Sequence, residues 1–139
     1  MNYNIKVNIT PTPGGRPRVT RWSTFYPKKH TQYIKDAAKQ GFICTPTRPK
    51  TPLETIVSIN TTYVLPLPKS TSKKKRLEMH GLFCEKHIDL DNLDKIFWDE
   101  ILVKGKIIKD DCQIVMNSSK KIWTSGTVGF TQCNVEELA

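Results

Sequence analysis

The sequence lacks any apolar run that approaches the roughly 20 residues needed to cross a bilayer. Its first residues, Met1 to Lys6, lack the apolar segment of a secretory signal. Acidic residues are also scarce, because 13 Asp and Glu stand against 22 Lys and Arg and leave a net charge of +9. We therefore expect a cytoplasmic protein without a membrane partner, which binds a polyanion such as nucleic acid.

Closely spaced cysteines are absent as well. The four cysteines include no C-x-x-C pair, so the sequence favours neither a disulfide framework nor a common zinc motif. His80, Cys84 and His87 come nearest to a metal cluster, but zinc sites usually take four ligands from two spaced pairs. A loop that happens to hold these three residues is the simpler interpretation. With 139 residues, the chain has the size of one domain, 1–139.

The charge is distributed unevenly along the chain. Residues 1–79 carry 15 Lys and Arg but 3 Asp and Glu, a net charge of +12, whereas residues 80–139 carry 7 and 10, a net charge of −3. Clustered cations of this kind are typical of surfaces that contact phosphates. The predicted DNA contacts are Arg16, Arg18, Arg21, Lys28, Lys29, Lys69, Lys73, Lys74, Lys75 and Arg76.

The hydrophobic pattern predicts an α+β domain. Alternating apolar residues and β-branched runs indicate strands, and apolar residues at helical spacing indicate helices. In the best helix, Leu93, Ile96, Phe97 and Ile101 form one apolar side. We predict strands over 2–10, 54–65, 112–123 and 126–133, helices over 29–41, about 70–78 and 90–103, and irregular segments over 11–28 and 42–53.

Carboxylates gather at the start of the predicted helix 90–103. At 100° per residue, Asp91, Lys95 and Asp99 share one stripe of this helix, away from its apolar side. Asp89 precedes the helix in an extended segment, which directs its side chain to the same side as that of Asp91. The entrance of the helix therefore combines two carboxylates with an ammonium group.

A second acidic pair, Asp110 and Asp111, follows that helix after a short return. An antiparallel return of this length can bring one of the two carboxylates back beside the helix start. Three carboxylates around one pocket can hold Mg²⁺ or Mn²⁺, which activates water or stabilises the leaving oxygen of a phosphodiester. Lys95 can offset the charge of the transition state.

Simpler interpretations of the same residues remain open at this point. Asp89 and Asp91 can be helix N-caps, which stabilise a helix by about 1 kcal/mol. Asp91, Lys95 and Asp99, at i, i+4 and i+8, can form a surface ladder of ion pairs. The Asp110–Asp111 pair can belong to a turn.

The chain resembles the RusA-type Holliday junction resolvases, endonucleases that are common in phages and prophages. The pattern D-x-D-N-x-x-K, formed by Asp89, Asp91, Asn92 and Lys95, is followed further along the chain by D-D-x-Q, and the combination is more specific than either part. The matching pieces occur in the family's order at residues 16–21, 67–70 with 73–75, 87–99 and 108–114.

The resemblance implies roles for individual residues. Asp89, Asp91 and Asp111 resemble the family's three metal-binding aspartates, and Lys95 resembles its catalytic lysine. Asn92, Asp99 and Asp110 are expected to support them. The implied cofactor is Mg²⁺, for which Mn²⁺ can substitute, with no small-molecule cofactor.

The resemblance also implies a fold and partners. The expected fold is a small mixed sheet with helices packed on one side, in a homodimer that binds branched DNA. A Holliday junction has approximate two-fold symmetry, so a C2 dimer presents one carboxylate site to each of two opposed strands. The expected setting is the cytoplasm of a bacterial host, with recombination and repair as the process.

Three other functions compete with this interpretation. A non-catalytic phage DNA-binding regulator would use the basic half alone. A metal-dependent nuclease for flaps or single strands would share the chemistry and differ in the surface that shapes its substrate. An interaction protein that docks a partner on its acidic helix would leave the positive charge of residues 1–79 unexplained.

Overall fold

A five-stranded sheet forms the centre of the fold in the computed structural model, which describes residues 1–13, 18–19, 21, 24–25, 28–86 and 88–138. The strand order is β4-β1-β7-β5-β6, in which β5 and β6 are parallel and the other neighbours are antiparallel. The strands are β1 (Asn2–Val7), β4 (Ile43–Thr45), β5 (Val57–Pro66), β6 (Ile114–Thr124) and β7 (Phe130–Glu137). The sheet is mixed and the fold is α+β, as predicted.

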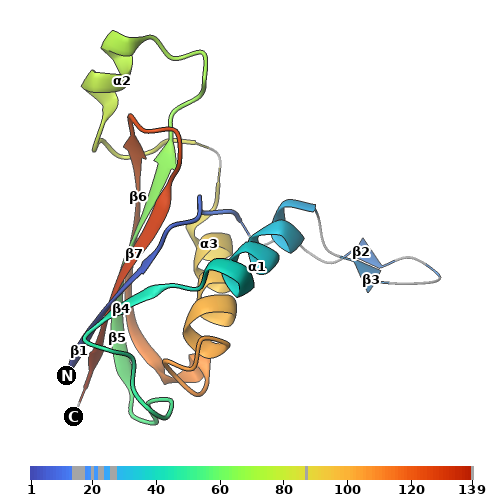
Figure 1. The fold of residues 1–139 in the computed structure, drawn as a ribbon, viewed down its shortest axis with the longest axis vertical. Coiled ribbons are helices and arrows are strands. Elements are labelled where there is room, and N and C mark those ends of the chain that lie inside the picture. The colour runs from blue at the N-terminus through green and yellow to red at the C-terminus, as the bar shows by residue number, and fades with distance from the viewer. Residues whose placement is uncertain (14–17, 20, 22–23, 26–27, 87, 139) are drawn as a thin grey trace.

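The helices that cover the sheet lie on one side of it (Figure 1). They are α1 (Lys28–Gln40) and α3 (Leu90–Phe97), which continues as the π-helix η1 (Trp98–Val103). In β1, Tyr3, Ile5 and Val7 are buried against this side, while the residues between them are exposed. Strand alternation therefore places the core between the sheet and these helices, as the period-two pattern predicts.

The predicted helix 90–103 exists, but it changes type in the middle. All four residues of its apolar side, Leu93, Ile96, Phe97 and Ile101, are buried. From Trp98 onward the helix is a π-helix rather than an α-helix. A π-helix closes its hydrogen bonds one residue later than an α-helix does, so residues after Phe97 no longer follow the 100° count.

Two further differences lie in segments that were expected to be irregular. Residues 43–45 form the short edge strand β4, which pairs with β1. The described part of 11–28 contains the two-residue strands β2 (Arg18–Val19) and β3 (Thr24–Phe25), which pair with each other. The helix expected over 29–41 is confirmed as α1. It ends at Gln40, and the next residue, Gly41, has a φ of +67° and donates its N–H to the Ala37 carbonyl at 2.9 Å.

A short helix stands beyond one end of the sheet (Figure 1). This helix, α2 (Lys73–Met79), is capped by Ser72, whose Oγ accepts from the Lys75 N–H at 3.3 Å. Below it lies a small separate apolar cluster, whose buried members are Leu65, Leu67, Cys84 and Trp123. The loop that carries α2 is therefore fastened to the sheet by a core of its own.

No helix in the described ranges is long and apolar enough to cross a membrane.

Candidate active site

The first acidic pair lies at the start of α3. Asp89 is the N-cap residue, with extended φ and ψ of −72° and 130°, and Asp91 lies in the first turn. Both are exposed, and so are Asn92 and Lys95, the other residues of the predicted motif. The structure therefore presents all four motif residues to solvent from the start of one helix.

The simpler interpretations of these residues do not match the structure. The Asp89 side chain makes no capping hydrogen bond, although it occupies the cap position. Between residues that the structure describes, no salt bridge involves Asp91, Lys95 or Asp99. The carboxylates at the start of α3 are thus not used by the helix itself as caps or as an ion-pair ladder, and they are available to a ligand.

The second acidic pair begins a 3-10 helix, η2 (Asp111–Gln113). Asp110 caps it, because its Oδ1 accepts from the Cys112 N–H at 3.0 Å. This hydrogen bond is the largest of the causes that lower the pKa of Asp110. Asp110 therefore has a defined structural task, and the next residue, Asp111, is exposed.

Asp111 is the carboxylate on which neighbouring charges act most clearly. Its pKa is raised, first by a hydrogen bond with the Asp110 side chain, then by burial and by the charges of Asp110 and Asp99, while the Lys95 charge lowers it. Asp99 is half-buried in η1. The return after the helix thus brings Asp111 within electrostatic range of Lys95 and Asp99.

Gln113 holds the turn that presents Asp111. Its Oε1 accepts from the backbone N–H groups of Lys109 and Asp110, both at 2.8 Å. Its Nε2 donates to the carbonyls of Leu53 and Thr55 at 2.7 and 2.8 Å. One side chain therefore fastens the acidic turn to the segment before β5. The quoted D-D-x-Q pattern contained this residue, but spacing alone gave no indication of its anchoring role.

Replacing Gln113 by Met is expected to lower the free energy of unfolding by about 1–3 kcal/mol, because four hydrogen bonds are lost and the Asp110 N–H and the Thr55 carbonyl need new partners. Urea unfolding followed by circular dichroism measures this change. Gln132→Met is the control, since Gln132 is exposed on β7, and its effect should stay within about 0.5 kcal/mol. Equal unfolding midpoints for the two variants would contradict the anchoring role.

The donor set suits a hard divalent cation. Carboxylate oxygens are what Mg²⁺ and Mn²⁺ prefer, and Asp111 is held among other negative groups whose repulsion a cation would relieve. In the described part of the chain, no three His, Cys, Asp or Glu side chains already stand close enough together to hold a metal. The chemistry of the donors therefore fits a divalent cation.

His80 and Cys84, two of the three residues that came nearest to a metal cluster in the sequence, have structural roles. His80 Nδ1 accepts from the Ser125 N–H at 3.0 Å, and Cys84 is buried in the cluster below α2. His87 lies outside the described residues. The two described members thus serve the packing of the α2 loop, which agrees with the simpler interpretation.

The predicted DNA contacts fall on separate parts of the surface. Lys73, Lys74 and Lys75 are exposed on α2, and Lys69 is exposed just before it. Arg76 is engaged in its own loop, because its Nε and Nη2 donate to the carbonyls of Thr71 and Pro68 at 3.1 and 2.9 Å. Of the other predicted contacts, Lys28 and Lys29 are exposed at the start of α1, and Arg21 is exposed before it. Arg16 and the side chain of Arg18 lie outside the described residues.

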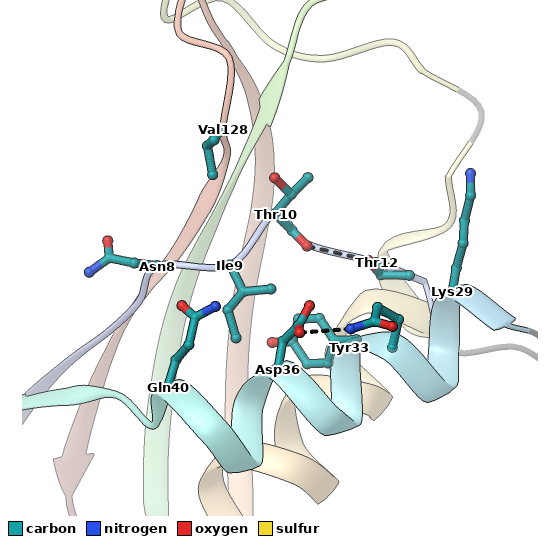
Figure 2. A pocket seen from close by; sticks show the side chains of 10 residues that line it. Asn8, Ile9, Thr10, Thr12, Lys29, Tyr33, Asp36, Gln40 and Val128 are labelled. Carbon is teal, nitrogen blue, oxygen red and sulfur yellow. Dashed lines mark hydrogen bonds between the residues drawn. The ribbon is translucent and has the colours of Figure 1, made fainter.

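A cavity of about 330 Å³ opens between the end of β1 and α1. Figure 2 shows Asn8 and Gln40 at one end of it and Lys29 at the other. Asp36 is engaged there by Gln32, whose Nε2 donates to Asp36 Oδ1 at 2.8 Å. None of the predicted catalytic residues lines this cavity, so it is separate from the carboxylates described above.

Comparison with known proteins identifies a family for this chain. Residues 8–129 match the family described as Endodeoxyribonuclease RusA, a range that includes every predicted site residue. No curated protein matches the chain. The match spans most of the 139 residues, from the end of β1 to the turn before β7. With its exposed D-x-D-N-x-x-K helix start and its anchored D-D-x-Q turn, the chain belongs to the RusA endodeoxyribonuclease family.

Proposed function

We propose that this protein is a structure-selective endonuclease that resolves Holliday junctions by paired nicks, as a homodimer and with Mg²⁺ or Mn²⁺, in DNA recombination and repair. Membership of the RusA family supports endonuclease action on branched DNA. The observation that carries the proposal to this site is the exposed carboxylate of Asp89, which makes no capping hydrogen bond, beside Asp91, which lies one turn before Lys95. Lys95 in turn acts electrostatically on Asp111. The proposed setting is the cytoplasm of a bacterial host, where branched DNA of this kind arises.

The proposed roles follow from the positions of the side chains. Asp89, Asp91 and Asp111 would hold the divalent cation. When bound, the cation supplies Lewis-acid stabilisation of the phosphodiester and lowers the pKa of a water molecule. Lys95, exposed on the same helix, carries the positive charge that stabilises the negative charge developing on the phosphate. Asp99 maintains the negative potential around Asp111.

The basic residues would position the substrate. Phosphate contacts fix the orientation of a nucleic acid without reading its sequence, which suits recognition of a junction by shape. The exposed lysines of α2, at one end of the sheet, would contact one arm. A second copy, related by a two-fold axis, would present the same lysines and carboxylates to the opposed strand.

The test is cleavage of a synthetic four-way junction in Mg²⁺ or Mn²⁺, beside linear duplex and flap substrates of the same sequence. Paired symmetric nicks on the junction are expected, with slower cleavage of the other substrates. Preferred cleavage of flaps would replace the resolvase by the flap-nuclease alternative. Binding in every metal without any cleavage would indicate a DNA-binding regulator.

Replacing Lys73, Lys74 and Lys75 together by Ala is expected to weaken junction binding and to flatten its salt dependence. Each lost phosphate contact reduces the slope of log K against log salt by about 0.9, so the change reaches about 2–3 if all three lysines contact phosphate. Alanine maintains the helix. The measurement is a titration at several salt concentrations.

The control carries the same loss of charge elsewhere. Lys35, Lys39 and Lys120 are exposed on α1 and β6, and none belongs to the predicted contacts. If the Ala variant of these three lost as much affinity and slope as the α2 variant, binding would depend on the overall field of the protein and the α2 contact would be wrong.

A further inference from the structure

A buried carboxylate lies next to the motif residues on α3. Asp94 is 5% exposed, although its neighbours in sequence at positions 91, 92 and 95 are exposed. It follows Asp91 by three residues and directly precedes Lys95, so it occupies the flank of the helix between the exposed motif and the apolar side. Asp94 falls on an unspecified position of the D-x-D-N-x-x-K pattern.

Two strands supply the hydrogen-bond donors for Asp94. Tyr63 on β5 donates its hydroxyl to Asp94 Oδ1 at 2.6 Å. On β6, Asn117 Nδ2 donates to Oδ2 at 3.0 Å, and Ser119 Oγ lies 2.8 and 3.0 Å from the two carboxylate oxygens. Both oxygens are thus satisfied by neutral side chains from the edge strand β6 and its neighbour β5.

Stability alone is a poor reason for this arrangement. A buried carboxylate loses its hydration, and neutral donors compensate for that loss only in part. Among the described residues no cation pairs with Asp94. Buried ionised groups of this kind commonly add little net stability compared with apolar residues of the same size. An apolar residue at this position would pack equally well, but it would not form the directional hydrogen bonds that Asp94 makes.

Most other contacts between α3 and the sheet are apolar, although Lys121 Nζ donates to the Ile88 carbonyl just before the helix at 2.7 Å. Leu93, Ile96 and Phe97 hold the helix on the sheet by apolar contact, which is non-directional and tolerates small rotations. Hydrogen bonds have narrow distance and angle preferences. Tyr63 stays a donor at all ordinary pH values, because burial and, after it, the hydrogen bond to Asp94 raise its pKa.

We propose that Asp94 is a positioning residue, whose hydrogen bonds to β5 and β6 fix the rotation of α3 and thereby the placement of Asp91 and Lys95. The effect on cleavage rests on the proposed function, whereas the effect on the helix does not. Asp94 itself is buried and contacts no substrate.

The experiment compares Asp94→Asn and Tyr63→Phe with Ile96→Val. The first variant keeps the size of the side chain but places an amide N–H among donors, and the second removes one donor. Ile96→Val removes a methyl group from the apolar side of the same helix and leaves all the hydrogen bonds of Asp94 intact. All are assayed at a temperature at which circular dichroism shows them folded.

The kinetic readout is kcat for junction cleavage, separated from the junction Kd measured without metal. Asp94→Asn is expected to lower kcat roughly 10- to 100-fold, because small misplacements of reacting groups are costly. Tyr63→Phe should have a smaller effect in the same direction. Both variants should bind the junction within about twofold of wild type. A kcat for Asp94→Asn equal to that of Ile96→Val would overturn the proposal.

A second readout does not depend on activity. The backbone amide NMR signals of Asp91 and Asn92 are expected to shift in Tyr63→Phe and to stay in place in Ile96→Val, because rotation of α3 moves them and loss of one methyl group does not. Unmoved signals in Tyr63→Phe would overturn the proposal even if Asp94→Asn did not fold. If wild type cleaved no DNA, the proposed function would fail, while this readout would still decide the positioning role.

Discussion

Junction cleavage is expected to fall by roughly 10²–10³-fold or more in Asp91→Asn, while junction binding stays the same or becomes tighter. The exposed amide keeps the size of the side chain, so the first turn of α3 is preserved. It removes a negative charge that holds the cation, and loss of a single electrostatic group at a reaction centre has effects of this size. It also removes repulsion between the carboxylate and the DNA phosphates, which opposes binding.

The matched control for this variant is Asp36→Asn. Asp36 lies in α1, accepts a hydrogen bond from Gln32, and lines the cavity of Figure 2 rather than the acidic site. Its replacement causes the same change in net charge and should leave kcat within about twofold of wild type. Full cleavage activity in Asp91→Asn would end the assignment of this carboxylate to the catalytic site.

Asp111→Asn is expected to abolish cleavage and, at neutral pH, to raise the thermal stability of the protein. The hydrogen bond with Asp110, burial and the Asp110 and Asp99 charges raise the pKa of Asp111 above its ordinary value of 3.8. A raised pKa means that the folded state binds this proton more strongly than the unfolded state does. The ionised carboxylate is therefore unfavourable in the folded protein, and Asn removes that cost.

The sign of the pH dependence follows from the same shift. The stabilising effect of the bound proton is fully present below pH 3.8 and is lost as the pH rises through the pKa of folded Asp111. The Tm advantage of Asp111→Asn should thus grow over that interval and be constant above it, as thermal melts between pH 3 and 8 would show.

The neighbouring residue gives a control of opposite sign. The pKa of Asp110 is lowered, first by the Cys112 N–H, so its ionised form stabilises the fold above pH 3.8. Asp110→Ala, which loses the cap of η2, should therefore lower the Tm at neutral pH. A lower Tm in both variants at neutral pH would show that the charges around Asp111 do not oppose folding.

Much of the fold could be predicted because buried residues recur at a regular spacing along strands and helices. Tyr3, Ile5 and Val7 alternate on a half-buried strand, and Leu93 and Ile96 recur on one side of a helix; both patterns are local and both are confirmed. The edge strand β4 was missed because three residues followed by Pro46 carry no alternation long enough to recognise. Its pairing depends on β1, which is distant in sequence.

The exposure of the motif residues could be predicted from the sequence, whereas the geometry after Phe97 could not. The motif at the start of α3 is exposed as predicted. The stripe that joined Asp99 to Asp91 and Lys95 assumed a continuous α-helix, whereas Asp99 lies in a π-helix and its charge acts on Asp111. The hydrogen bonds of Asp94 could not be predicted, because all of its donors lie on β5 and β6. Contacts between residues that are distant in sequence leave no local sequence pattern.

The path from the π-helix to the acidic turn has a consequence for insertions and deletions. A Cβ at Gly105 would overlap the Ile101 carbonyl, Lys106 has a positive φ of 62°, and Ile107, which is fully buried, is hydrogen-bonded to the Leu53 N–H. Each of these constraints applies to one particular position in the segment. Inserting or deleting a residue would therefore break them and move Asp111 away from Lys95. Natural variation in chain length should therefore be rare between Lys104 and Asp111 and should fall on exposed loops elsewhere.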